Sequence, residues 1–336
     1  MGDVSRVFSL GVFMTGPDLA SIRAAADTLR GTVIETPILP LASTRWDGVL
    51  PDCASVTLKL ELFQQAGSFK ARGAYLGVTG LDAAQRAAGV VAASGGNHAL
   101  AVAWAAQAAG VDALICMPRA VDPARIAGCE ALGAQVALYD DMAAAFAAMN
   151  DAAAKGRTLL HPFEAPHMTL GAATCGLEYA LQAPDINTFI VPIGGGGLIS
   201  GMACAIKRLR PDAQVIGVEP FGADSMFQSL QQGVPVTLER VATIADSLGS
   251  PLAMPYSFGL AQEYVDRIVR IEDAEMLRAM EIYQSTLRIT AEPACAASLA
   301  AILGPLRADL EGRHVGIIAC GSNISLHRYA ELMRAL

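Results

Sequence analysis

The chain has only four lysines, and one of them stands in a segment that could do covalent chemistry. Lys70 lies in QQAGSFKARGAYLG, residues 64–77, shortly after Gly67 and Ser68. We expect a helix to begin at Ser68, so the positive end of the helix dipole and partial burial would lower the pKa of the Lys70 amine. A neutral lysine amine can bond covalently to a carbonyl carbon. We expect the other three lysines to be exposed: Lys59, Lys155 and Lys207.

A run of four glycines indicates a phosphate site. IVPIGGGGLISGMACAIK, residues 190–207, places these glycines between a predicted strand and a predicted helix. Glycines let the backbone approach an anion closely, and the N–H groups and dipole of a helix start favour negative charge. The spacing fits neither a dinucleotide fingerprint nor a P-loop. The predicted phosphate cradle is Gly194, Gly195, Gly196 and Gly197.

Two further segments place small and polar residues directly after buried strands. ASGGNH, residues 93–98, offers open backbone amides and a neutral side-chain donor that could hold a carboxylate or phenolate. GIIACGSN, residues 316–323, places the Cys320 thiol where it could contact a heteroaromatic nitrogen without fully protonating it. Each segment also has a structural interpretation: Ser94 or Asn97 could cap a helix, and Cys320 could be a buried thiol.

The elements that must position these residues alternate between strands and helices. Expected strands span residues 89–94, 113–118 and 134–140, with helices at 97–109, 122–132 and 142–155. After HPFEAPH, residues 161–167, a second series has strands at 187–193, 213–220, 266–273 and 314–320, and helices at 198–210, 225–232, 272–287, 293–303 and up to 336. This alternation predicts two parallel-sheet units with right-handed crossovers. Ligands of such sheets bind at the carboxyl ends of the strands.

Length and composition limit the class of protein. The 336 residues suggest two domains, and the net charge of −8 has no basic block, so nucleic acid is a poor candidate partner. The seven cysteines include no C-x-x-C pair and are expected to be reduced. No apolar run approaches the ~20 residues of a membrane span. The apolar run at residues 7–14 lacks signal-peptide flanks, so we expect a soluble cytoplasmic protein.

Taken together, the motifs resemble one enzyme family. They are S-F-K-x-R-G-A at residues 68–74, S-G-G-N-H at 94–98, G-G-G-G-L at 194–198, E-P at 292–293 and C-G-S-N at 320–323. In this order they resemble the pyridoxal-phosphate (PLP) enzymes of fold type II, the tryptophan synthase β-subunit fold, and within them the serine/threonine dehydratase family. The resemblance implies an α/β protein of two three-layer α/β/α domains with an interdomain active-site cleft. The large PLP-binding domain would comprise residues 1–60 and 160–336, and the small domain, residues 61–159, would carry the S-G-G-N-H loop.

The resemblance also implies roles for single residues. Lys70 would hold the cofactor covalently and act as the catalytic base, Asn97 would bond the cofactor 3-oxygen, and Cys320 would face its pyridine nitrogen. Other predicted cofactor contacts are Phe69, Gly194, Gly195, Gly196, Gly197, Leu198 and Glu292. The substrate α-carboxylate would be received by Ser94, Gly95, Gly96, Asn97 and His98. Glu219 and Ala223 match a cation site of racemase-like members, but Ser225 stands where an acid is usual, so no metal is assigned.

The activity implied is a dehydratase, or ammonia-lyase, that converts a 3-hydroxy amino acid to a 2-oxo acid and ammonia. L-threonine, L-serine, 3-hydroxyaspartate and bulkier substrates all fit this chemistry, and a homodimer or homotetramer is expected. The alternative within the fold is a PLP-dependent serine-type racemase. Racemase-like relatives carry a serine where this chain has Gly95, so we expect elimination to dominate. A cofactor-binding protein without catalysis and a nucleotide-binding oxidoreductase are further alternatives. They are disfavoured by Lys70 and by the missing dinucleotide fingerprint.

Overall fold

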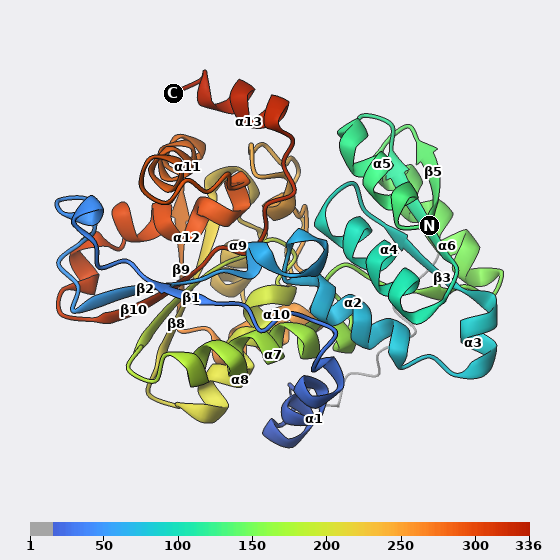
Figure 1. Ribbon diagram of the computed structural model, residues 1–336, viewed down its shortest axis with the longest axis horizontal. Helices are drawn as coiled ribbons and strands as arrows, with labels where there is room; N and C mark the ends of the chain where they lie inside the picture. The colour runs from blue at the N-terminus through green and yellow to red at the C-terminus, as the bar shows by residue number, and fades with distance from the viewer. Residues whose placement is uncertain (1–15) are drawn as a thin grey trace.

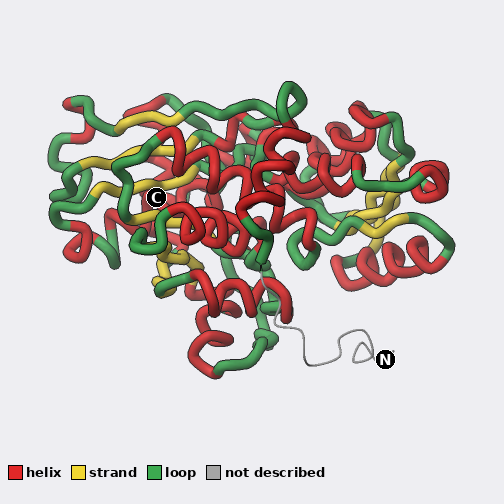
Figure 2. Tube along the Cα trace, turned by 90° about the horizontal axis from the view of Figure 1, so that it is seen from below, coloured by secondary structure: helices red, strands yellow, loops and turns green. Residues whose placement is uncertain are grey.

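The computed structural model describes residues 16–336, which form two β-sheets covered by helices (Figure 1). The apolar run at residues 7–14 and the first 15 residues of the predicted large domain lie outside the described residues. Figure 2 shows the two groups of strands at opposite ends of the molecule, with helices between them.

The larger sheet has six strands in the order β1-β2-β10-β7-β8-β9. Only β1 pairs antiparallel, and the other neighbouring strands are parallel. Both faces of this sheet are covered by helices, which is why its central strands read as continuous apolar runs rather than alternating ones. The strands are β1 (Ile38–Pro40), β2 (Ser55–Lys59), β7 (Thr188–Pro192), β8 (Gln214–Pro220), β9 (Arg267–Ile271) and β10 (His314–Ile318).

Helices lie on both faces of this sheet, giving three layers (Figure 1). One face carries α11 (Asp273–Leu287) and α12 (Pro293–Leu303), and the other carries α7 (Pro166–Gln182), α8 (Gly197–Leu209) and α10 (Pro255–Tyr264). The remaining helices of this part are α1 (Leu19–Leu29), α9 (Ser225–Gln232) and α13 (Leu326–Met333). Short 3₁₀ turns span Thr44–Trp46, Glu61–Phe63, Gln65–Gly67, Phe221–Ala223, Asp246–Leu248 and Arg307–Leu310.

The smaller sheet has four parallel strands in the order β5-β4-β3-β6. They are β3 (Val90–Ala93), β4 (Ala113–Pro118), β5 (Gln135–Tyr139) and β6 (Thr158–Leu159). Side chains of β3 alternate between two cores: Val90 and Ala92 pack with α2 (Lys70–Thr79), α4 (Asn97–Ala109) and α5 (Pro123–Ala131), and Val91 and Ala93 pack with α6 (Met142–Ala154). Helix α3 (Ala83–Ala88) completes this part. We call this sheet with α4, α5 and α6 the four-stranded unit, and the larger sheet with its helices the six-stranded unit.

The fold class predicted from the sequence is confirmed, and two local expectations are wrong. Helix α2 begins at Lys70, not at Ser68, and no side chain caps it. Lys59 is fully buried, because it is paired with Glu178 on α7 and donates to the main-chain carbonyl of Thr36 (2.7 Å). The predicted domain boundaries stay a prediction.

Candidate active site

Lys70 is the first residue of α2, and its amine points at a carbonyl of another segment. Nζ donates to the main-chain oxygen of Pro162 at 2.7 Å and lies 5.1 Å from the ring centroid of Phe69. Burial lowers the pKa of the Lys70 amine to about 8, although Cys320 and Glu292 act in the opposite direction. A sizeable fraction of this amine is therefore neutral near physiological pH.

The segment around Lys70 is attached to the segment that follows β10, although about 250 residues separate them in sequence. The main-chain N–H of Phe69 donates to the oxygen of Cys320 (3.2 Å), and that of Ser322 donates to the oxygen of Gly67 (3.0 Å). Ser68 also forms an isolated β-bridge with Gly321. The first and last motifs of the sequence thus meet at one place.

Asn97 is the first residue of α4, and its side chain lies at the same place. Its Nδ2 donates to Glu292 Oε1 (2.6 Å) and to Ser247 Oγ (3.3 Å), and its Oδ1 accepts from Asn323 Nδ2 (2.7 Å). No side chain caps α4, so neither Ser94 nor Asn97 acts as the helix cap that the structural interpretation required. The Asn97 amide is held in a fixed orientation by three polar partners.

Glu292 is buried beside Asn97, and one of its two carboxyl oxygens has no hydrogen-bond partner among the described residues. Burial raises the pKa of its carboxyl to about 7, with a further contribution from Asp246. Its Oε2 has no hydrogen-bond partner among the described residues. A Cβ on Gly321 would lie 2.7 Å from Glu292 Oε1, so only glycine fits against this carboxyl. An unpartnered buried oxygen indicates that the site is completed by another group.

The four glycines lie between the end of β7 and the start of α8, as predicted. Gly196 has a φ of +90°, and a Cβ on Gly195 would lie 2.3 Å from the ring of Phe163. On Gly194 it would lie 2.7 Å from the oxygen of Ser247. The first N–H groups of a helix have no partner within the helix. Side chains are thus excluded at Gly194 and Gly195, and the N–H groups at the start of α8 are donors of the kind that a phosphate group requires, so the residues present fit a phosphate.

Cys320 and His98 are both buried and both neutral. Burial raises the pKa of the Cys320 thiol well above its usual value, so the thiol stays protonated and meets the oxygen of Ala294 at 3.6 Å. Burial lowers the pKa of His98 well below its usual value, and its Nε2 donates to the oxygen of Leu160 (2.8 Å). The hydrogen bond of the His98 side chain is therefore made outside the 94–96 loop. Only the main chain of His98 is left to contact a ligand at that loop.

Arg125, a residue with no signal in the sequence, donates hydrogen bonds that hold the 94–96 loop in place. Arg125 on α5 donates to the oxygen of Gly95 (3.0 Å), and the Gly96 N–H donates to Ser94 Oγ (3.1 Å). The same guanidinium reaches the six-stranded unit at the main-chain oxygen of Asn323 (3.0 Å) and at Asp246 Oδ2 (2.6 Å).

Phe69 is half-buried, and Leu198 is buried at the second position of α8.

Some residues of this site had a signal in the sequence and some had none. Asn323 lies within C-G-S-N, and Phe163 lies within HPFEAPH, so both could have been found from their motifs. Arg125 and Ser247 lie in segments without a recognisable pattern.

Glu219 matches the cation site of racemase-like enzymes, but in this structure its side chain binds main-chain N–H groups. Its carboxylate accepts from the main-chain N–H groups of Met226 (3.0 Å) and Phe227 (2.7 Å) at the start of α9, and burial raises its pKa to about 8. Ser225 is buried and supplies no carboxylate. Within residues 16–336, no three His, Cys, Asp or Glu side chains gather as metal ligands.

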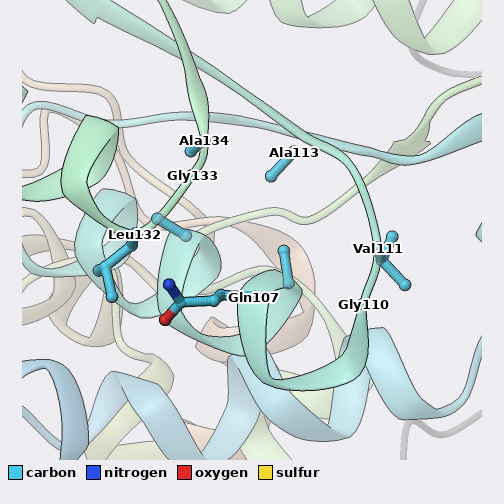
Figure 3. A pocket seen from close by; sticks show the side chains of 9 residues that line it. Gln107, Gly110, Val111, Ala113, Leu132, Gly133 and Ala134 are labelled. Atoms are coloured by element: carbon cyan, nitrogen blue, oxygen red, sulfur yellow. The ribbon is translucent and has the colours of Figure 1, made fainter.

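A cavity of about 190 Å³ lies elsewhere, near the amino-terminal end of β4 (Figure 3). Ligands of parallel sheets bind at the carboxyl ends of strands, and the lining of this cavity carries no ionisable side chain. It is therefore separate from the site around Lys70. Its lining residues are Ala103, Ala106, Gln107, Gly110, Val111, Ala113, Leu132, Gly133 and Ala134.

Comparison with known proteins identifies the class. The family model described as "Pyridoxal-phosphate dependent enzyme" matches residues 29–321. Phenylserine dehydratase of Ralstonia pickettii is 43% identical over 94% of this chain and 96% of its own length. L-threonine ammonia-lyase of Thermotoga maritima is 37% identical over 92% of this chain and 76% of its own length. The structure of maize serine racemase superimposes with a TM-score of 0.87 at 33% identity, covering 95% of this chain and 98% of that one.

The chain therefore belongs to the pyridoxal-phosphate dependent enzymes, and its fold is that of fold type II. Its cofactor is pyridoxal phosphate, and it is a lyase of the ammonia-lyase type. Among residues 16–336, no helix has the length and apolar character needed to cross a bilayer.

Proposed function

We propose that this enzyme eliminates the β-hydroxyl of a 3-hydroxy amino acid and releases a 2-oxo acid and ammonia. Water is lost in the elimination and regained when the nitrogen is released, so amino acid equals oxo acid plus ammonia. When bound, pyridoxal phosphate withdraws electron density from the substrate Cα and makes loss of the α-proton feasible. The rest of the chemistry falls to side chains and amides of this chain.

Lys70 is proposed as the covalent anchor and as the base that removes the α-proton. A base must be neutral to accept a proton, and burial brings the pKa of this amine to about 8. The Pro162 oxygen, 2.7 Å from Nζ, orients the amine when the anchor bond is open. No other lysine has this combination of burial and freedom from a carboxylate, because Lys59 and Lys207 are paired with Glu178 and Asp266 and Lys155 is exposed.

The remaining cofactor contacts follow the site's geometry. The loop of Gly194, Gly195, Gly196 and Gly197, with Leu198, is proposed to hold the phosphate. Asn97, fixed by Glu292, is proposed to bond the 3-oxygen, and Phe69 to pack near the ring. The Cys320 thiol is proposed to face the pyridine nitrogen. A neutral thiol cannot fix a positive charge there, which favours prompt loss of the hydroxyl over amino-group transfer.

The 94–98 loop is proposed to receive the substrate α-carboxylate. Ser94 Oγ now accepts the Gly96 N–H, at the place where a carboxylate oxygen could accept it instead. Arg125 holds the Gly95 oxygen outward, and the N–H and C=O of a peptide point in opposite directions. The amide that follows Gly95 is thereby directed to the inner side of the loop.

The observation that favours elimination over racemisation is Gly95. A racemase needs a second proton donor on the face of the substrate opposite the lysine, and glycine has no side chain to supply one. A carbanion on this enzyme must lose its β-hydroxyl or regain its proton from Lys70 on the original face. The chain resembles serine racemase in sequence as well as in fold, and Gly95 is the difference that supports our proposal of a dehydratase.

Chiral chromatography tests this proposal. L-serine and L-threonine are incubated with holoenzyme, and α-epimers and 2-oxo acids are measured in the same samples. We expect oxo acid without sustained epimer formation. Formation of the α-epimer at a rate equal to or above oxo-acid release would establish a racemase instead.

The relatives named for phenylserine and threonine support a neutral 3-hydroxy amino acid as the substrate. L-threonine, L-serine, 3-hydroxyaspartate and 3-phenylserine form the panel for an oxo-acid assay. We further propose a cytoplasmic homodimer or homotetramer, for which the family resemblance is the support and sedimentation analysis is the test.

A further inference from the structure

Three half-buried aromatic rings form a continuous cluster beside Lys70. We call Phe146, His161 and Phe163 the ring cluster. The rings of His161 and Phe163 meet edge to face, with centroids 4.8 Å apart and planes at 85°. Phe146, from α6, continues the cluster with its centroid 6.0 Å from that of His161. None of these rings is needed for the proton transfer assigned to Lys70.

The segment that carries two of these rings is held rigidly by its own side chains. His161 Nδ1 accepts the main-chain N–H of Glu164 at 3.0 Å. The Glu164 carboxylate in turn accepts from the Tyr256 N–H (2.5 Å) and the Ser257 hydroxyl (2.9 Å) at the start of α10. These hydrogen bonds fix the turn that carries the rings of His161 and Phe163.

The turn that carries two of the rings, residues 161–163, contacts both Lys70 and the glycine loop. Lys70 Nζ is 2.7 Å from the oxygen of Pro162, the residue between His161 and Phe163. The Phe163 ring packs directly against Gly195. If Lys70 holds the cofactor as proposed, the substrate amino group would be bound close to Nζ, and its Cα would lie near the same turn. With the α-carboxylate at the 94–98 loop, the ring cluster is an aromatic surface next to Lys70 that a β-substituent could contact.

The cluster offers apolar faces and no positive charge. A backbone N–H can only donate, so His161 Nδ1 must be unprotonated and the ring neutral. Burial, with a smaller effect of Lys70, lowers the pKa of His161 to about 4, in agreement with this geometry. The second carboxylate of 3-hydroxyaspartate would lose its hydration at the ring cluster, and the three rings offer no positively charged group to pair with it. A phenyl group would stack on the rings.

We propose that the ring cluster of Phe146, His161 and Phe163 binds the β-substituent and makes the enzyme select 3-hydroxy amino acids with an aromatic β-group. The proposal rests on the proposed function for placing the substrate beside Lys70. Phe146 is the specificity-determining residue to test, because it lies at the end of the cluster away from Lys70 and the glycine loop.

The first measurement is binding to holoenzyme, using amino acids that have no β-hydroxyl to lose. Isothermal titration calorimetry compares L-phenylalanine, L-alanine and L-aspartate. We expect L-phenylalanine to bind at least roughly tenfold tighter than L-alanine, and L-aspartate to bind weakest, because aromatic pairing adds to apolar burial. Phe146→Leu keeps the apolar volume but removes the ring, and it should reduce the L-phenylalanine preference several-fold. Phe63→Ala, which removes an aromatic ring that is 51% exposed outside the cluster, is the control and should change nothing.

The second measurement is oxo-acid release from 3-phenylserine, L-threonine and 3-hydroxyaspartate. We expect the highest kcat/KM for 3-phenylserine in the native enzyme and a lower ratio to L-threonine in Phe146→Leu. Equal binding of L-phenylalanine and L-alanine, or a preference unchanged in Phe146→Leu, overturns the inference even if all substrates are turned over. Selective binding without oxo acid from any substrate would overturn the proposed function and leave the ring cluster as the binding determinant.

Discussion

At the scale of single residues, the proposed function depends on the Lys70 amine, whose surroundings lower its pKa. Lys70 is kept from full protonation mainly by burial. Its partner in the structure is a neutral carbonyl oxygen rather than a carboxylate. Lys59 is also buried, yet it is paired with Glu178, which stabilises its ammonium form. Burial alone does not make a reactive lysine, and the nature of the partner decides.

We predict that the rate of cofactor capture by the apoenzyme follows the ionisation of Lys70. Below a pH of about 8 the amine is mostly protonated and cannot attack, so the rate should rise with pH through about 8 and then level off. For an unperturbed lysine the rise would continue toward ~10.4. Stopped-flow absorbance after mixing apoenzyme with pyridoxal phosphate measures this rate. Lys70→Ala should show neither covalent capture nor steady turnover, whereas Lys155→Ala should behave as native. A profile still rising steeply at pH 10 would contradict the prediction.

The sequence predicted the residues whose environment is local and missed those whose partners lie far along the chain. Lys70, Asn97 and the glycines belong to motifs that carry their own chemistry. Arg125 is an ordinary helical arginine in the sequence, and it matters because α5 lies against Asp246, 121 residues away. An exposed Lys59 is the expectation from sequence, because the sequence alone does not reveal its acidic partner on α7.

At the scale of elements, the start of α2 is fixed by a buried ion cluster of Lys59, Glu61, Arg72 and Glu178. Arg72 binds Glu61 through Nε (2.9 Å) and Nη2 (2.7 Å), and Nη2 also lies 3.0 Å from Glu178. Lys59, Glu61 and Arg72 are each at most 2% exposed. Because Arg72 is two residues from Lys70, the cluster also sets where the reactive amine lies.

We predict that Arg72→Met destabilises the protein strongly. Removing the guanidinium leaves the buried Glu61 carboxylate without its main partner, which typically costs ~3–5 kcal/mol of unfolding free energy. Urea denaturation measures the loss. The double variant Glu61→Met with Arg72→Met should be more stable than the single variant, because it removes the uncompensated charge as well. Arg30→Ala, which breaks an exposed pair with Asp27, is the control and should have no measurable effect. A double variant no more stable than the single one would argue against a charge effect.

The crossing of α2 and α7 is set by two glycines, and it yields a further prediction. A Cβ on Gly171 would lie 2.2 Å from the backbone nitrogen of Gly73, so Gly171→Ala must push the helices apart. We expect a loss of ~1–3 kcal/mol in unfolding free energy and reduced activity, because α2 carries Lys70. Gly259→Ala is the matched control: a Cβ there meets nothing within 4 Å, so alanine should stabilise α10 by up to ~1 kcal/mol. Thermal denaturation with an activity assay compares the two, and equal stability of both variants would contradict the prediction.

Most elements could be predicted because apolar runs and helix starts are local signals. Helix α4 has the predicted bounds, and the strands of both sheets lie within the predicted ranges, apart from β1, β2 and β6. Helix α7 has no counterpart among the predicted elements, because its glycines and small residues obscure the amphipathic pattern. Those small residues exist for close packing against α2 and α8, which is a tertiary requirement. In the sequence, residues 161–164 mark only the boundary between the two series of elements, although their turn carries two of the three rings.

At the scale of the whole molecule, the four-stranded and six-stranded units are joined next to the 94–96 loop. Arg125 belongs to the four-stranded unit, and its guanidinium bonds Gly95 of that unit together with Asp246 and the Asn323 oxygen of the six-stranded unit. Its side chain is only 13% exposed, so these charge-assisted bonds are partly shielded from water. A group that ties both units to the proposed carboxylate loop can couple substrate binding to their relative position.

We predict that Arg125→Met raises the KM for the amino-acid substrate by ~10–100-fold, because hydrogen bonds to a charged group contribute ~1.5–3 kcal/mol. The effect on kcat should be smaller, since neither Lys70 nor the glycine loop contacts Arg125, and cofactor affinity measured by fluorescence titration should stay near native. Arg125→Lys should recover part of the loss, because an ammonium keeps the charge but not the planar fork that reaches three oxygens. Arg119→Met removes an exposed arginine shortly before α5 and should leave KM unchanged. If Arg125→Met instead lowered kcat and cofactor affinity with KM unchanged, the guanidinium would be supporting the cofactor site through Asn323 rather than the substrate loop through Gly95.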